Sequence, residues 1–126
     1  MNYKTDMARV KGLGSAKEGT HDWWVGRLTS VALIPLTLCF LWKVAPLIGG
    51  AHADLLTAFQ SPFTAITTIL FIMIAFFHLA GGLQEVIVDY VHSKATLVVL
   101  LVSTKLVCWG MGFAGAFAVA KIAFGI

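Results

Sequence analysis

The stretch from Leu55 to Gln84 carries no charged side chain. About 20 apolar residues in a helix cross the roughly 30 Å hydrocarbon core of a bilayer. Soluble domains average about 25% charged residues, whereas this chain of 126 residues has 12% charged and 59% hydrophobic residues. Ser61-Pro62 is a typical helix start. The stretch therefore predicts a membrane-spanning helix at roughly residues 62–89.

A second apolar stretch covers residues 23–48. Its two charged residues, Arg27 and Lys43, lie near its ends, where long side chains can reach the lipid headgroups. Tryptophans, which favour the membrane interface, lie near the same ends at Trp23, Trp24 and Trp42. We therefore predict a first transmembrane helix at roughly residues 24–48.

A third apolar stretch, residues 95–124, contains only Lys105 and Lys121 as charged residues and predicts a helix at roughly 95–123. Small residues four apart in its second half predict close packing on a neighbouring helix; they are Gly110/Ala114/Ala118 and Gly112/Ala116. The chain is thus predicted to be an all-α integral membrane protein with three transmembrane helices. Its length leaves room for a single membrane domain, residues 1–126.

The segments outside these helices are polar. Residues 1–22 are rich in charge and glycine, so we expect a solvent-side tail without a packed helix and without a cleaved signal peptide. Residues 49–60 are predicted to be a loop. Cys39 and Cys108 lie in apolar stretches without CxxC or Cys/His spacing, and we expect neither a disulfide nor a zinc site.

Lysine and arginine near the helix ends predict the orientation, because cytoplasmic segments carry more of them. The 49–60 loop has none, and Lys121 is the exception on the same side. The opposite side carries Lys4, Arg9, Lys11, Lys17, Arg27 and Lys94. We therefore expect the N-terminus inside and the C-terminus outside. Because these cations flank apolar helices, the net charge of +3 does not indicate a nucleic-acid partner.

His78 lies midway along the second predicted helix, where a neutral imidazole must find partners for both nitrogens without water. Gly81 and Gly82 follow at helical spacing and would clear a surface beside it for a flat porphyrin. Two interpretations stay open: an axial ligand of a haem, or a histidine bonded to a neighbouring helix with glycines for packing. The other histidines lie at or beyond the membrane boundary, so a second axial ligand would come from another chain; they are His21, His52 and His92.

Tyr90 follows His78 by twelve residues, about 18 Å along a helix axis. Its phenol could donate a hydrogen bond to a quinone carbonyl, or it could be an ordinary interfacial tyrosine. Glu85 and Asp89, one turn apart at the same helix end, suggest a docking surface for cations or two solvated carboxylates.

Two cationic side chains in the predicted membrane helices, Arg27 and Lys105, need polar or anionic surroundings. Arg27 either reaches the headgroups or pairs with a carboxylate inside the membrane. Lys105 lies about eleven residues into its helix, too deep to reach the headgroups easily, so it should face protein, a propionate or water.

Together these residues resemble a known family. Gly19-Thr20-His21-Asp22 with Arg27, followed by His78, Gly82 and Asp89-Tyr90, is similar to the smaller hydrophobic membrane anchor of bacterial succinate dehydrogenase, respiratory complex II. The resemblance spans roughly residues 12–95 and the three-helix plan.

The resemblance implies a multi-pass protein of the bacterial inner membrane that shares a haem b with a second anchor chain, the cytochrome b anchor. A flavoprotein subunit and an iron-sulfur subunit would lie on the inner face. By motif, His78 would be an axial ligand of the haem iron and Arg27 would pair with a haem propionate. Tyr90 would contact ubiquinone, with Asp89 supporting that site. For His21 and Asp22 it suggests only a haem-side or partner-contact role.

The resemblance implies a non-dehydrogenase subunit serving the tricarboxylic acid cycle and respiratory electron transport. The chain has no dinucleotide-binding glycine motif and no cysteine cluster, so flavin and iron-sulfur centres would belong to partners. The alternative is a small membrane transporter or a non-redox structural subunit of another complex. A transporter would usually place an acidic residue in mid-membrane, whereas here the mid-membrane groups are His78 and Lys105.

Overall fold

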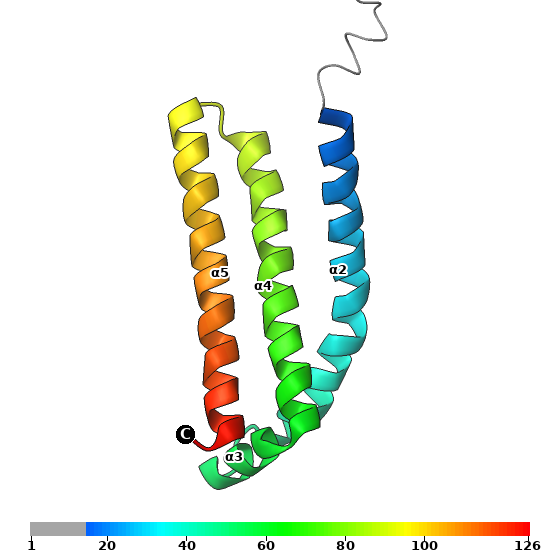
Figure 1. The fold of residues 1–126 in the computed structure, drawn as a ribbon, viewed down its shortest axis with the longest axis vertical. Coiled ribbons are helices and arrows are strands. Elements are labelled where there is room, and N and C mark those ends of the chain that lie inside the picture. The colour runs from blue at the N-terminus through cyan, green and yellow to red at the C-terminus, as the bar shows by residue number, and fades with distance from the viewer. Residues whose placement is uncertain (1–14) are drawn as a thin grey trace, which may run out of the picture.

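The computed structural model describes the backbone of residues 15–126 and the side chains from residue 21 onward. Within this part of the chain every element is helical, as the sequence predicts (Figure 1). The elements are α2 (Ser15–Val44), a 3-10 turn η1 (Ala45–Leu47), α3 (His52–Gln60), α4 (Pro62–Tyr90) and α5 (Lys94–Phe124).

Three of these helices, α2, α4 and α5, are long and apolar enough to cross a membrane. They run alternately up and down, with α4 between α2 and α5 (Figure 1). The 29 residues of α4 span about 44 Å at 1.5 Å per residue, so its ends extend beyond the roughly 30 Å hydrocarbon core. The prediction of three transmembrane helices is confirmed.

The ends of α4 and α5 follow from local backbone chemistry. Pro62 is the first residue of α4, where its missing N–H costs no hydrogen bond. The helix ends at Tyr90 because Val91 adopts an extended conformation. Gly125 terminates α5 with a left-handed φ of 69°, a conformation that glycine adopts without steric cost.

Two segments differ from the sequence predictions. The helix α2 begins at Ser15, so residues 15–22 of the predicted tail are helical. The remainder of the predicted tail, residues 1–14, lies outside the described residues. The predicted 49–60 loop contains α3, whose Phe59 is buried among residues of neighbouring elements. Polar residues near the start of this segment suggested a loop, but Leu55 and Phe59, four apart, give α3 an apolar face that packs.

The closest helix pair is α4 with α5. A Cβ added at Gly112 would lie 3.4 Å from the Cβ of Phe76, and one at Gly115 would lie 3.0 Å from Cγ2 of Ile72. The predicted stripe containing Gly112 therefore lies against a neighbouring helix. The other predicted stripe does not pack against the helices described here, since its three residues are exposed: Gly110, Ala114 and Ala118.

Few of the described side chains are buried within this single chain. One small cluster, Phe59 with Ala65 and Val119, lies where α3 meets α4 and α5. Along α2 the most apolar window has no buried residue, and Trp42 is 73% exposed. Such large exposed apolar surfaces mark contact with lipid or with another protein. We infer that most of the apolar surface of α2 is covered by one or the other.

The two ends of the bundle differ. The start of α2, the end of α4 and the start of α5 share one end, which we call the Tyr90 end; α3 and the C-terminus lie at the other (Figure 1). Pro35 lies inside α2 and removes one backbone hydrogen bond of that helix. The helix α2 approaches α4 more closely near α3 than at the Tyr90 end (Figure 1). Besides Lys121, Lys43 is a second cation near the α3 end, with its ammonium 5.5 Å from the ring centre of Phe63.

Candidate functional site

A groove of about 580 Å³ lies among α2, α4 and α5. Binding sites for small molecules and cofactors typically enclose about 300–1,000 Å³. Residues of all three helices line it, and we call it the His78 groove. Its lining includes Asp22, Trp23, Arg27, Thr29, Phe77, His78, Gly81, Gly82, Glu85, Lys105 and Trp109.

His78 is half-buried and hydrogen-bonded across two helices. Its Nδ1 lies 2.8 Å from Oγ1 of Thr29 on α2. The same hydroxyl lies 2.9 Å from the carbonyl oxygen of Val25 and 3.0 Å from that of Gly26. One ring nitrogen of His78 therefore has a protein partner within the chain. Sequence reasoning missed Thr29 because its partner is 49 residues away on another helix.

This hydrogen bond alone does not decide between the two interpretations of His78, because a bond to a neighbouring helix was one of them. It does account for only one of the two ring nitrogens. Hydrogen bonds between membrane helices average about 0.6 kcal/mol, so this bond contributes little to holding α2 on α4. Its main physical effect is to restrict the orientation of the imidazole.

The glycines after His78 bear more directly on the choice between a haem ligand and a histidine bonded to a neighbouring helix. A Cβ added at Gly81 or Gly82 would meet none of the described atoms within 4 Å. Neither glycine is therefore required by close packing among residues 21–126, unlike Gly112 and Gly115 on α5. Both line the His78 groove, where their missing side chains leave open space.

Charged side chains line the same groove from α2 and α5. Arg27 is exposed, and its guanidinium carbon lies 5.4 Å from the ring centre of Trp23. Lys105 lines the groove from the opposite helix, together with the carboxylates of Asp22 and Glu85 on α2 and α4. The groove thus combines an imidazole with two cations and two carboxylates.

The remaining predicted site residues lie outside this groove. Asp89 and Tyr90 form the last residues of α4, and Tyr90 is 80% exposed. His21 is exposed on the first turns of α2, and His52 is the first residue of α3 at the other end of the bundle. Among residues 21–126, no group of three or more His, Cys, Asp or Glu side chains is placed to hold a metal ion.

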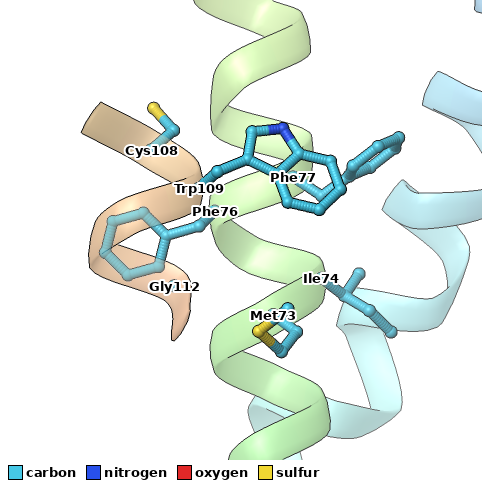
Figure 2. A pocket seen from close by; sticks show the side chains of 7 residues that line it. All are labelled: Met73, Ile74, Phe76, Phe77, Cys108, Trp109 and Gly112. Atoms are coloured by element: carbon cyan, nitrogen blue, oxygen red, sulfur yellow. The ribbon is translucent and has the colours of Figure 1, made fainter. Parts of the chain in front are cut away.

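A smaller apolar pocket of about 230 Å³ lies between α4 and α5, and Figure 2 shows its lining. Phe77 and Trp109 line both spaces. Their rings meet edge to face, with centroids 6.0 Å apart and planes at 86°. Phe76, Met73 and Cys108 line the smaller pocket alone, and the α5 side of the His78 groove consists of Lys105 and Trp109.

Comparison with known proteins identifies the family. The family of the succinate dehydrogenase/fumarate reductase transmembrane subunit matches residues 1–119. The chain belongs to this family. Together with the three apolar helices, this confirms the prediction of a multi-pass membrane protein of the bacterial inner membrane.

Individual relatives support the same family assignment. The chain is 34% identical over 125 residues to the succinate dehydrogenase hydrophobic membrane anchor subunit of Paracoccus denitrificans, covering 99% of this chain and 96% of the relative. It is 26% identical to the subunit of the same name from Rickettsia bellii, covering 83% of this chain and 84% of the relative. The succinate dehydrogenase membrane anchor subunit of Reclinomonas americana is 32% identical, over 66% of this chain and 72% of its own length. No solved structure gave a significant match.

These matches favour a membrane anchor subunit of succinate dehydrogenase over the alternative of a small transporter. Such an anchor is a non-catalytic chain within an enzyme complex, as the sequence predicts.

Proposed function

We propose that this anchor subunit binds a b-type haem through His78 and forms part of a ubiquinone-reduction site at Tyr90. The observation that carries the haem proposal is the environment of His78. One imidazole nitrogen is bonded to Thr29 at 2.8 Å, which leaves the other for a ligand. Two glycines with no packing role among the described residues lie beside the ring.

The residues of the His78 groove fit a haem. A porphyrin needs a neutral imidazole nitrogen for its iron, a flat apolar surface for its ring and cations for its two propionates. His78 offers the nitrogen, and Gly81 and Gly82 offer the flat surface. Arg27 and Lys105 offer two positive charges from different helices. When bound, the haem would supply one-electron redox chemistry inside the membrane.

A second axial ligand comes from a partner chain in this proposal. His21, His52 and His92 lie near helix ends, whereas His78 lies within α4. The partner is a second anchor, a cytochrome b chain, which would also cover the exposed face of α2. The complex also contains an iron-sulfur subunit and a flavoprotein subunit, which carry the chemistry of succinate.

The quinone proposal rests on the position of Tyr90. Tyr90 is 80% exposed at the end of α4, about 18 Å along the axis from His78. A neutral phenol can donate a hydrogen bond to a quinone carbonyl and stabilise negative charge as that oxygen is reduced. Asp89 precedes it and would support the site from the same turn. The walls of the pocket come from the partner subunits.

The proposed orientation places the Tyr90 end inside and the α3 end with the C-terminus outside. Arg27 and Lys94 lie toward the Tyr90 end, and Lys43 and Lys121 toward the other. In this orientation Lys43 would be a second cation on the outer side, beside Lys121. The excess of cations on the inner side then depends on the residues before the first apolar stretch, which include Lys4, Arg9, Lys11 and Lys17.

The haem proposal predicts the effect of removing the imidazole. His78→Leu should lower the haem content of the purified complex by about tenfold or more, because the iron loses an axial ligand. Reduced-minus-oxidised absorption spectra measure this directly. His52→Leu, on α3 at the other end of the bundle, is the matched control and should keep the wild-type spectrum. A wild-type spectrum in assembled His78→Leu complex would disprove the assignment.

The quinone proposal predicts a selective defect in Tyr90→Phe. The substitution removes only the hydroxyl, so the complex should assemble, keep its haem and oxidise succinate with an artificial acceptor that takes electrons upstream. Quinone reduction should fall by about 100-fold, the usual cost of losing a hydrogen bond to a developing oxyanion. Wild-type quinone reduction would mean that Tyr90 is only an interfacial aromatic residue.

The orientation is tested by cysteine labelling. Ser93→Cys and Ala51→Cys, both at exposed positions, are introduced into a chain whose Cys39 and Cys108 are replaced by alanine. A membrane-impermeant maleimide added outside intact cells should label position 51 and not position 93. Labelling of position 93 alone would reverse the orientation, and labelling of both would exclude the three-helix topology in the membrane.

A further inference from the structure

The hydroxyl of Thr29 has three close polar neighbours and one proton. Two of the neighbours, the carbonyl oxygens of Val25 and Gly26 at 2.9 and 3.0 Å, can only accept hydrogen bonds. The third is Nδ1 of His78 at 2.8 Å. If the hydroxyl proton pointed to Nδ1, two carbonyl oxygens would face the hydroxyl oxygen without a proton between them, which is repulsive.

The favourable arrangement gives the Thr29 proton to the carbonyl oxygens of its own helix. Threonine in a helix commonly makes this bond to the residue three or four positions earlier. The hydroxyl oxygen then accepts a hydrogen bond, and Nδ1 of His78 must carry the proton that is donated. A neutral imidazole has one N–H, so Nε2 carries the free lone pair.

From this geometry we propose that Thr29 is a positioning residue that fixes the tautomer of His78, so that Nε2 is the nitrogen that binds iron. The inference rests on the proposed haem function, because the tautomer matters to a ligand. Histidines that bind metals commonly donate their other N–H to an oxygen acceptor, which orients the ring and makes the ligating nitrogen more basic. In this chain the acceptor comes from a different helix, α2, and not from α4 itself.

A more basic axial nitrogen stabilises the oxidised iron more than the reduced iron. Loss of the Thr29 acceptor should therefore raise the midpoint potential of the haem. The ring of His78 would also lose its fixed orientation, and the affinity for haem should fall by about 10- to 100-fold, as is typical when such outer partners are removed. Both effects are independent of catalytic turnover.

The test compares Thr29→Val and Thr29→Ala in the assembled complex. Valine keeps the shape of threonine without the hydroxyl, and alanine removes the hydroxyl without a branched side chain, so a packing defect in one is checked by the other. An optical redox titration gives the midpoint potential, and haem per complex gives the occupancy. Both variants should show a raised potential and a lower haem content.

Two further variants serve as controls. Thr29→Ser keeps a hydroxyl that can accept from Nδ1, so it should retain a near wild-type potential. Thr67→Val makes the same substitution on α4, where the hydroxyl bonds the carbonyl oxygen of Phe63 at 2.7 Å and is exposed. It should leave haem content and potential unchanged.

The possible outcomes separate the role of Thr29 from that of His78. Wild-type potential and haem content in both hydroxyl-free variants would overturn the role of Thr29 while leaving His78 as a ligand. An equal shift in Thr29→Ser would also overturn it, since the effect would then not follow the hydroxyl. Absence of haem from the wild-type complex would overturn the proposed function itself, a result distinct from both.

Discussion

An imidazole within an apolar helix needs partners that the membrane does not supply. In this chain the partner is a threonine of the neighbouring helix, bonded to Nδ1 of His78 at 2.8 Å. That contact joins α2 to α4 at the groove, orients the ring and accounts for one of its nitrogens. The same groove is also lined by two glycines on α4 and by a cation from each flanking helix.

The chain by itself is an incomplete bundle. The helices α4 and α5 pack closely at Gly112 and Gly115, whereas α2 touches α4 through contacts such as the stacked rings of Phe40 and Phe71, 4.5 Å apart. On α5, the exposed small residues Gly110, Ala114 and Ala118 form a second face on which a helix could pack. A membrane anchor that functions within a complex needs such uncovered faces, because its partners complete the bundle.

The sequence predicted the three long helices well, because long apolar stretches without charge are rarely anything but membrane spans in a chain of this size. It also predicted His78, Arg27 and Lys105 as residues in need of partners, and all three line one groove. Sequence reasoning was wrong about residues 15–22 and missed α3. In both segments, polar residues and glycines obscure the sequence pattern of a helix. In α3 the helix depends on the burial of Phe59.

Thr29 could not be found from the sequence, since a threonine inside an apolar helix usually bonds only its own backbone. Its second contact requires the relative positions of α2 and α4. Likewise, the choice between the two small-residue stripes of α5 depends on how that helix is rotated about its axis. The residue pattern along one helix shows which of its faces can pack against a neighbour. The relative placement of the helices determines which of those faces does.

The most direct test of the central claim is an experimental structure of the assembled complex at a resolution that shows individual ligands. We predict haem density in the groove over Gly81 and Gly82, with Nε2 of His78 at coordination distance from the iron and Nδ1 still bonded to Oγ1 of Thr29. Iron bound through Nδ1, or a His78 groove filled by a partner helix or lipid with no haem beside His78, would contradict it.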